Sequence, residues 1–289
     1  MTTNPYLQPG RIQAALNTLG VRPSKELGQN FLIDAEALQA VVDAADLQPT
    51  DTVIEVGPGL GVLTYELVQR AGQVIAIEFD RRLATRLTEA IEVPHLRVVQ
   101  SDVLRIEPAE VVGAAGHYKL VANLPYQITS AILRHFLEAA LPPALAVVMV
   151  QREVAERIVA RPPHMSVLAH SVQLYTVPEI VRWVPAAAFL PVPKVDSAVL
   201  RLHRRPQLAV EVDDVDAFFR VIKAGFLQAR KKLGNALSIG LASFGTPLAK
   251  TEAIELLKGV DIDPDRRAET LTLEEWAQVY RALQHRSAV

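Results

Sequence analysis

Short apolar runs alternate with helix-length amphipathic segments through the first half of the chain. Branched residues dominate the runs, and the pattern predicts buried strands at residues 52–56, 74–77, 96–99, 120–122 and 146–150. The segments between them, such as residues 63–70, 81–91 and 129–140, have the apolar spacing of helices. This alternation is typical of βαβ units, so we expect an α/β fold with a parallel sheet covered by helices.

The pattern changes after residue 150. Two more strands are expected at residues 172–175 and 197–202, joined through the proline-rich stretch 185–193. Helices are expected at residues 218–228, 236–242, 251–258 and 273–284, and a capping box at residues 272–275 (TLEE) begins the last one. We therefore expect a Rossmann-like domain at residues 1–205 and a small, all-helical C-terminal domain at residues 206–289.

Local charge is more informative than the totals. The chain of 289 residues has a formal net charge of −2, so it is not basic overall. Residues 217–251, however, contain six Lys and Arg and no acidic residue, whereas residues 34–115 contain fourteen acidic residues and six arginines. Because charge is screened within about 8–10 Å, the field of such a segment acts locally. The basic segment therefore indicates a surface that faces a polyanion.

The composition excludes several kinds of functional site. The absence of cysteine excludes disulfides, thiolate nucleophiles and cysteine-ligated metals. The seven histidines show no metal-binding spacing, so we expect no metal ion. The first residues lack the apolar core of a signal peptide, and no apolar run approaches the roughly 18 residues of a membrane span. We expect a cytoplasmic protein without a membrane partner.

A glycine-rich loop, residues 55–64 (EVGPGLGVLT), lies between the first expected strand and the next helix. Gly57, Gly59 and Gly61 remove side chains where a ligand would lie against the backbone, and the helix N-terminus presents N–H groups to it. The spacing is GxGxG, not the GxGxxG that places a pyrophosphate in dinucleotide-binding folds. No P-loop GK[ST] is present either.

Two acidic residues follow at the ends of the next two expected strands. Glu78 ends the second strand, where a carboxylate accepts hydrogen bonds from both hydroxyls of a ribose. Asp102 ends the third, where a carboxylate is placed to accept from the exocyclic amine of an adenine. A ligand with a ribose and an adenine but no phosphate is S-adenosyl-L-methionine. We therefore expect this cofactor at the carboxyl edge of the sheet.

The tetrapeptide Asn123-Leu-Pro-Tyr126 follows the fourth expected strand. The amine of adenine is a poor nucleophile because its lone pair is delocalised into the ring. The side-chain carbonyl of Asn123 and a backbone carbonyl held by Pro125 can accept its two N–H bonds and direct the lone pair at a methyl group. Tyr126 supplies a face on which the base stacks. We expect Asn123, Pro125 and Tyr126 to be the catalytic residues.

An adenine reaches such a pocket only by leaving its stack or from a loop, at a cost of a few kcal/mol. A second aromatic ring would hold its other face, and Phe189, in the proline-fixed stretch 188–197, is the candidate. In the basic segment, Arg230, Lys231 and Lys232 are candidate contacts to RNA phosphates.

With these residues identified, the chain resembles the small-subunit rRNA adenine N6-dimethyltransferases (KsgA/RsmA type) over nearly its whole length. Residues 27–32 (LGQNFL) look like the first motif of that family, residues 55–64 like its glycine loop, and residues 123–126 like its NLPY. Residues 189–199 match its FxPxPKVDSAV signature, and residues 226–237 (FLQARKKLGNAL) are similar to its basic helical segment. The chain departs from the family at residues 162–167 (PPHMSV, usually YGxLSV) and at Gly234, where an arginine is common.

The resemblance implies an S-adenosyl-L-methionine-dependent methyltransferase of ribosome biogenesis. Its substrate would be the N6 atoms of two adjacent adenosines in the hairpin near the 3′ end of small-subunit (16S) rRNA, within a pre-assembled subunit. We expect a monomer, because no coiled-coil heptads appear. The resemblance implies that the cofactor contacts Asn30, Leu32, Gly57, Glu78, Asp102 and Asn123, and we add Gly59 of the glycine loop to this set. It implies that the target base contacts Asn123, Tyr126 and Phe189.

Three other functions remain open from the residues. An erythromycin-resistance-type methyltransferase shares the glycine loop but modifies an adenine of large-subunit rRNA. A non-catalytic assembly or transcription factor on the same fold has no need for Glu78, Asp102 and the NLPY tetrapeptide together. A small-molecule or DNA N6-adenine methyltransferase is the third alternative.

Overall fold

The computed structural model describes residues 4–20 and 30–287, with side chains up to residue 286. The chain forms two compact units, the first comprising Met1–Ala155 with Val177–Arg204 and the second comprising Glu156–Thr176 with Arg205–Val289. The second unit therefore also includes Glu156–Thr176, a segment that lies inside the range 1–205 expected for the first domain.

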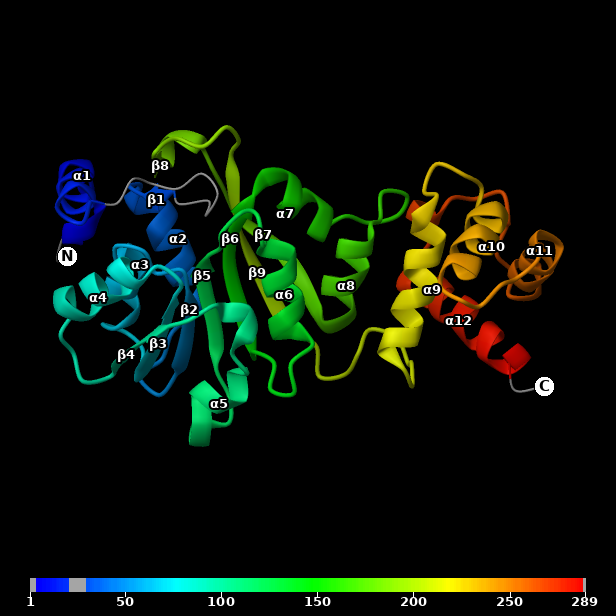
Figure 1. The fold of residues 1–289 in the computed structure, drawn as a ribbon, viewed down its shortest axis with the longest axis horizontal. Helices are drawn as coiled ribbons and strands as arrows, with labels where there is room; N and C mark the ends of the chain where they lie inside the picture. Colours follow the sequence, from blue (N-terminus) through cyan, green and yellow to red (C-terminus); the bar gives the residue numbers. More distant parts are fainter. Residues whose placement is uncertain (1–3, 21–29, 288–289) are drawn as a thin grey trace. The chain divides into compact units, whose positions relative to one another are not determined.

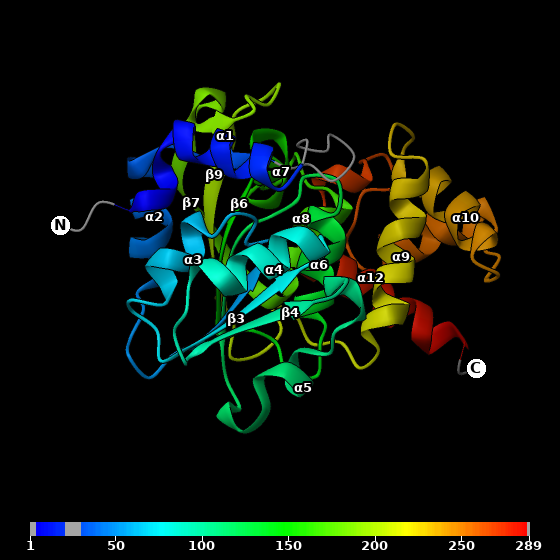
Figure 2. The same ribbon diagram turned by 60° about the vertical axis from the view of Figure 1, so that its left-hand side comes forward.

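The first unit is built on a seven-stranded sheet in the order β4-β3-β2-β5-β6-β9-β7 (Figure 1, Figure 2). Its strands are β2 (Thr52–Val56), β3 (Gln73–Glu78), β4 (Leu96–Gln100), β5 (Lys119–Asn123), β6 (Leu145–Gln151), β7 (Thr176–Val184) and β9 (Ser197–Arg204). Strands β2 to β6 pair in parallel, and β9 runs antiparallel to β6. Counted alone, the five parallel strands have the doubly wound order 3-2-1-4-5, which confirms the expected Rossmann-like sheet.

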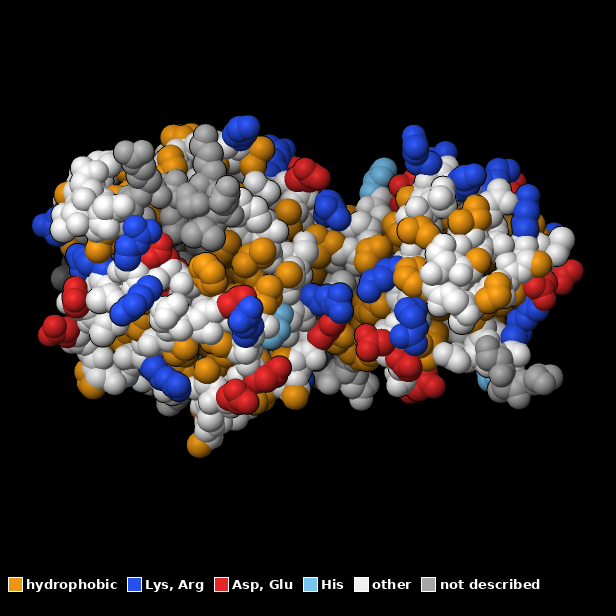
Figure 3. Space-filling model, viewed as in Figure 1, with side chains coloured by type: hydrophobic (Ala, Val, Ile, Leu, Met, Phe, Trp, Pro, Cys, Tyr) orange, Lys and Arg blue, Asp and Glu red, His pale blue; other side chains and the backbone are white. Residues whose placement is uncertain are grey.

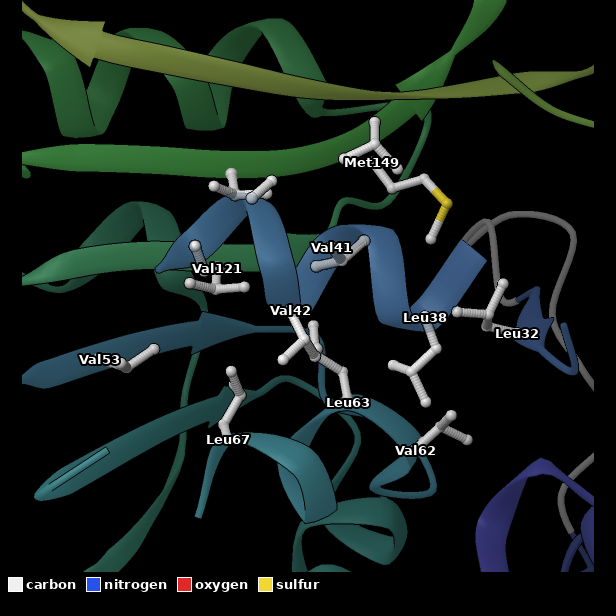
Figure 4. Packing of buried hydrophobic residues seen from close by; sticks show 14 of the residues in the cluster. Leu32, Leu38, Val41, Val42, Val53, Val62, Leu63, Leu67, Val121 and Met149 are labelled. Carbon is white, nitrogen blue, oxygen red and sulfur yellow. The ribbon is translucent and has the colours of Figure 1, made fainter. Parts of the chain in front are cut away.

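Helices pack on this sheet through apolar faces. The helices of the first unit are η1 (Pro5–Leu7), α1 (Pro9–Thr18), α2 (Ala35–Ala45), α3 (Val62–Leu67), α4 (Arg81–Ala90), η2 (Val103–Arg105), α5 (Pro108–Val112), η3 (Gly113–Ala115), α6 (Thr129–Leu137) and η4 (Ala186–Ala188), and α7 (Arg152–Ile158) begins in it. Asp34 caps α2 by accepting the N–H of Ala37 at 2.7 Å. In Figure 4, Val41 and Val42 of α2 and Leu67 of α3 lie in the same core as the strand residues Val53 and Val121.

The N-terminal part of the chain is packed against the carboxyl edge of the sheet. A two-residue strand, β1 (Phe31–Leu32), pairs antiparallel with β8 (Phe189–Leu190). Helix α1 buries Ile12 and Leu16 in a separate small cluster with Leu60 of the glycine loop and Leu83 of α4. The segments around the glycine loop are therefore held by contacts over long sequence distances.

The prediction of a strand at residues 172–175 was wrong. These residues form the last turn of α8 (Val167–Tyr175), and the strand β7 begins only at Thr176. Ser166 starts the helix by accepting the N–H of Ala169 at 3.1 Å, and the Thr176 hydroxyl donates to the carbonyl oxygen of Val172 at 2.9 Å. Leu168, Ala169, Val172 and Leu174 are all buried. A short helix with so little polar surface gives the same apolar run as a buried strand.

The second unit is helical, as expected. Besides α8 it contains α9 (Val215–Leu227), α10 (Leu233–Ser243), α11 (Lys250–Gly259), η5 (Ala268–Thr270) and α12 (Leu273–Ser287). Trp276 and Tyr280 of α12 are buried in its core with Phe218 of α9. The capping box is confirmed, because the backbone N–H of Glu275 donates to the Thr272 hydroxyl at 3.1 Å and the Glu275 carboxylate accepts the N–H of Thr272 at 2.7 Å.

The described parts of the chain contain neither a membrane-spanning helix nor a cluster of metal-binding side chains. Among residues 4–20 and 30–287, no helix is both long enough and apolar enough to cross a bilayer. The same residues contain no group of three or more His, Asp or Glu side chains placed to hold a metal ion.

Candidate functional site

A cavity of about 310 Å³ opens at the carboxyl edge of the sheet. It lies where β2 and β5 are neighbours and the strand order reverses, which is the ligand-binding position in doubly wound folds. The structure brings together here all the residues expected to contact a cofactor. These are Asn30, Leu32, Gly57, Gly59, Glu78, Asp102 and Asn123. Of the 27–32 motif, residues 27–29 lie outside the described part of the chain.

The glycine loop is held in a conformation that favours glycine. Gly59 and Gly61 have φ of +58° and +90°, in the left-handed region. A Cβ atom on Gly59 would lie 3.1 Å from the Phe31 ring, and one on Gly61 would lie 2.7 Å from a methyl group of Leu87. A side chain at Gly59 would therefore displace Phe31 in the cavity wall, and one at Gly61 would displace Leu87 in the core. Gly61 also caps α3, whose N-terminus faces the loop.

Glu78 is fixed by backbone donors on both oxygens. Its Oε2 accepts the N–H of Gly59 at 3.0 Å and its Oε1 accepts the N–H of Asp80 at 2.9 Å. The side chain is buried, and burial raises its pKa. A carboxylate has about four acceptor positions. The remaining acceptor capacity suits the hydroxyls of a ribose.

Asp102 lies two residues beyond the end of β4 and caps the short helix η2, since its Oδ1 accepts the N–H of Leu104 at 3.0 Å. Its carboxylate also lies 3.8 Å from Arg105. Asp102 and the neighbouring Val103 and Leu104 all line the cavity, so this loop offers one carboxylate and two apolar side chains to a ligand.

Asn123, the last residue of β5, is oriented by the segment before β1. Its side-chain Nδ2 donates to the carbonyl oxygen of Asn30 at 3.3 Å. This bond places the amide nitrogen, so the amide oxygen lies on the opposite branch, available as an acceptor. The carbonyl oxygen of Pro125 accepts from the N–H of Ile128 at 3.2 Å and from the Thr129 hydroxyl at 3.0 Å. Because the carbonyl of Pro125 is used in this way, the carbonyl of Leu124, which precedes Pro125, is the one that could accept from an amine.

Tyr126 also lines the cavity, with its ring part-exposed and its hydroxyl anchored. The hydroxyl lies 2.7 Å from the Ser197 hydroxyl at the start of β9. Burial raises the pKa of Tyr126, so the phenol stays protonated at neutral pH. The anchored hydroxyl fixes the direction of the long axis of the ring. Sequence reasoning missed Ser197, although it lies in the PKVDSAV stretch.

Glu55 is a second residue that sequence reasoning did not single out. It is part of β2, lines the cavity and is almost fully buried. Its Oε2 accepts the Thr64 hydroxyl at 2.7 Å. Burial, with a smaller contribution from the nearby carboxylate of Glu78, raises its pKa from 4.5 to about 8. The sequence signal for Glu55 is a single charged residue inside a short strand of mostly branched, uncharged residues.

Phe189 is not brought to the cavity. Its side chain is fully buried in the main core of the first unit, and it does not line the cavity. In this conformation the ring has no open face on which a base stacks, because β8 pairs with β1 and turns the side chain inward. Phe189 supports the site from within the core.

The three basic candidates of the second unit differ in environment. Arg230, Lys231 and Lys232 are all exposed, in the turn between α9 and α10. Lys232 forms an ion pair of 2.7 Å with Asp265, which already partly neutralises it. Gly234 is buried, and a Cβ atom there would lie 2.9 Å from Ile254, so this position is packed rather than open to a phosphate. On the face shown in Figure 3, basic and acidic side chains are interspersed.

Comparison with known sequences identifies close relatives. A family model described as ribosomal RNA adenine dimethylase matches residues 21–283. A ribosomal RNA small subunit methyltransferase A from Dehalococcoides mccartyi is 52% identical over 259 residues, which cover 89% of this chain and 87% of that protein. The protein of the same name from Moorella thermoacetica is 45% identical, with 96% and 98% covered.

Solved structures share the fold. The 23S rRNA methyltransferase ErmE superposes with a TM-score of 0.68 at 29% identity, covering 88% of this chain and all of that one. A dimethyladenosine transferase from Plasmodium falciparum has a TM-score of 0.74 at 23% identity, with 89% and 98% covered, and supports the fold alone. The extent of the family match and the identity to curated relatives lead to one conclusion: this chain belongs to the ribosomal RNA adenine dimethylase family.

Proposed function

We propose that this protein is an S-adenosyl-L-methionine-dependent rRNA adenine N6,N6-dimethyltransferase. Its substrate is the pair of adjacent adenosines in the 3′-terminal hairpin of small-subunit rRNA, presented by a pre-assembled subunit in the cytoplasm, and it acts as a monomer. The observation that carries the proposal is the Asn123–Tyr126 tetrapeptide at the wall of a cavity that also contains Glu78 and the glycine loop. The curated relatives named small subunit methyltransferase A support the choice of subunit.

The residues of the cavity fit this cofactor. Glu78 offers its remaining acceptor capacity to a ribose, and the glycine loop lets a ligand lie against backbone that a Cβ at Gly59 would obstruct. Asp102, with Val103 and Leu104, suits an adenine that has one amine and two apolar faces. When bound, S-adenosyl-L-methionine supplies an activated methyl group.

The chain's own contribution is to hold the acceptor adenine. The amide oxygen of Asn123 and the carbonyl oxygen of Leu124 accept the two N–H bonds of N6, which turns its lone pair out of conjugation with the ring. Tyr126 stacks on the base, with its ring fixed through Ser197. No strong base is required, because the nitrogen loses its proton easily once it carries the new methyl group. Phe189 acts indirectly, by fixing β8 beside β1.

The second unit provides the contacts to the RNA backbone. Arg230 and Lys231 are the exposed cations of the α9–α10 turn for which no ion pair is seen among the described residues. They are therefore better placed than Lys232 to neutralise phosphates. We propose that they hold the subunit while the first unit carries out the transfer.

The decisive experiment is methylation of separated ribosomal subunits. Under-methylated small subunits and, in parallel, large subunits are incubated with the protein and cofactor, and their rRNA is digested and analysed by mass spectrometry. The proposal requires N6,N6-dimethyladenosine at two adjacent positions of small-subunit rRNA. Methylation of large subunits alone would favour the erythromycin-resistance type. No methylation of either, with cofactor bound, would favour a non-catalytic factor.

Replacement of Asn123 by Ala separates catalysis from cofactor binding. We expect methyl transfer to fall by about 100-fold or more, by analogy with loss of one preorganised polar group in other enzymes. Cofactor affinity, measured by calorimetry, should fall far less than methyl transfer, because Glu78 and the glycine loop remain although the bond from Asn123 to Asn30 is lost. The matched control is Asn17→Ala on the exposed side of α1, which should leave both quantities unchanged. Full activity of the Asn123 variant would refute the assigned role.

A further inference from the structure

An arginine and an exposed tryptophan form a stacked pair in the first unit. Trp183, near the end of β7, has 45% of its surface exposed, which is unusual for so large an apolar side chain. The guanidinium carbon of Arg152, the first residue of α7, lies 5.1 Å from the centre of the Trp183 ring. This is a cation–π contact, and it fixes the indole at the surface.

Short backbone links tie this pair to the residues proposed to hold the target base. The N–H of Arg152 donates to the carbonyl oxygen of Asp196 at 2.9 Å. The Asp196 carboxylate accepts the N–H of Ala186, three residues after Trp183, at 2.9 Å. The next residue, Ser197, holds the Tyr126 hydroxyl at 2.7 Å. Asp196 and Ser197 thus anchor both the Trp183–Arg152 pair and the Tyr126 ring.

The chemistry of the pair suits a nucleotide. Unpaired bases stack on aromatic rings and on arginine guanidinium planes. When one adenine leaves its stack, the base beside it loses a stacking partner and needs a new surface. On the same strand, Glu179 lies 3.8 Å from Arg201, so its charge is already partly balanced.

We propose that Trp183 binds the nucleotide adjacent to the target adenosine, with its base stacked on the indole ring that Arg152 holds at the surface. The inference rests on the proposed function, because it assumes an unpaired adenosine pair as substrate. It assigns to the first unit a substrate contact that lies outside the cavity and outside the basic turn of the second unit.

The test measures binding of an RNA hairpin with two adjacent unpaired adenosines in its loop. A second hairpin carries an abasic site in place of one of the two adenosines. We expect Trp183→Leu to weaken binding of the intact hairpin about tenfold, and the abasic site to weaken binding to the wild type by a similar factor. Because Trp183→Leu and the abasic site remove the same contact, the variant should bind the abasic hairpin only slightly more weakly than it binds the intact hairpin. Trp183→Phe should retain most of the affinity.

Intrinsic fluorescence gives an independent measurement. The chain has two tryptophans, and Trp276 is fully buried in the core of the second unit. The intact hairpin should therefore quench the wild type but not Trp183→Leu, and the abasic hairpin should quench less. Val181→Ala, at another exposed position of β7, is the matched control and should bind as the wild type does.

Three results would overturn the inference. These are wild-type hairpin affinity in Trp183→Leu, additive effects of that variant and the abasic site, and equal quenching of the two proteins. Strong binding of an unrelated protein at this surface, with unchanged RNA affinity in Trp183→Leu, would identify it as a protein interface instead. If the variant binds normally while the wild type dimethylates small-subunit rRNA, only this inference fails. If the wild type methylates no rRNA, the proposed function fails first.

Discussion

The buried carboxyl group of Glu55 makes a quantitative prediction about stability and pH. Burial raises its pKa from 4.5 to about 8, and its carboxyl group accepts the Thr64 hydroxyl at 2.7 Å. Below pH 4.5 the group is protonated in both the folded and the unfolded chain. Between pH 4.5 and about 8 the unfolded chain releases this proton and the folded chain keeps it. The free energy of unfolding therefore falls as pH rises through this range and levels off above it.

The replacement Glu55→Gln removes this dependence. The amide is neutral at every pH, has nearly the same shape and can still accept the Thr64 hydroxyl. The free energy of unfolding falls by about 1.4 kcal/mol for each pH unit over which only the folded chain keeps the proton. Between pH 6 and the folded-state pKa of about 8, the fall is roughly 3 kcal/mol. We expect the wild type to lose this amount between pH 6 and pH 9 relative to the variant. Burying the amide has its own free-energy cost, but this cost does not depend on pH. It therefore does not alter how the stability difference between the two proteins changes with pH.

The assay is urea unfolding without cofactor, followed by circular dichroism at pH 6, 7, 8 and 9. The matched control is Glu110→Gln at an exposed position of α5, which should follow the wild type at each pH. The reasoning would be refuted if the stability difference between wild type and Glu55→Gln stayed constant from pH 6 to pH 9, because Glu55 would then not hold a proton in the folded state.

Three further changes test other parts of the site. Gly61→Ala combines φ of +90° with a contact of 2.7 Å to a leucine methyl group, so we expect unfolding to become easier by about 2–4 kcal/mol in denaturant titrations. Ser197→Ala releases the Tyr126 hydroxyl and should raise KM for small subunits several-fold with little change in cofactor affinity, as steady-state kinetics would show. Neutralising Arg230 and Lys231 together should reduce the slope of log affinity against log salt by about 1.5–2, whereas unchanged salt dependence would exclude them as phosphate contacts.

Elements with strong local signals were predictable from the sequence. The glycine loop, the five strands of the parallel sheet and the capping box at Thr272 and Glu275 depend mainly on residues close together in the chain. The strand ends that line the cavity followed from the parallel topology, since it brings successive carboxyl ends to one edge. This is why Glu78, Asp102 and Asn123 lie together, although 45 residues separate the first from the last.

Features that depend on distant partners were not predictable in the same way. Phe189 is turned into the core because β8 pairs with β1, a segment far away in the sequence. Lys232 looks like its two basic neighbours until Asp265 is found beside it. Residues 172–175 belong to a helix because the cap at Ser166 and the surrounding core decide between two structures with the same apolar pattern.

The small cluster formed by α1 has a practical consequence for handling the protein. Ile12 and Leu16 cover Leu60 and Leu83, so a product shortened to begin after α1 would expose the apolar underside of the glycine loop to water. Such a product would be prone to self-association and would report weak ligand binding for reasons unrelated to the chemistry of the pocket. Purification tags and crystallisation trimming should therefore leave the first twenty residues intact.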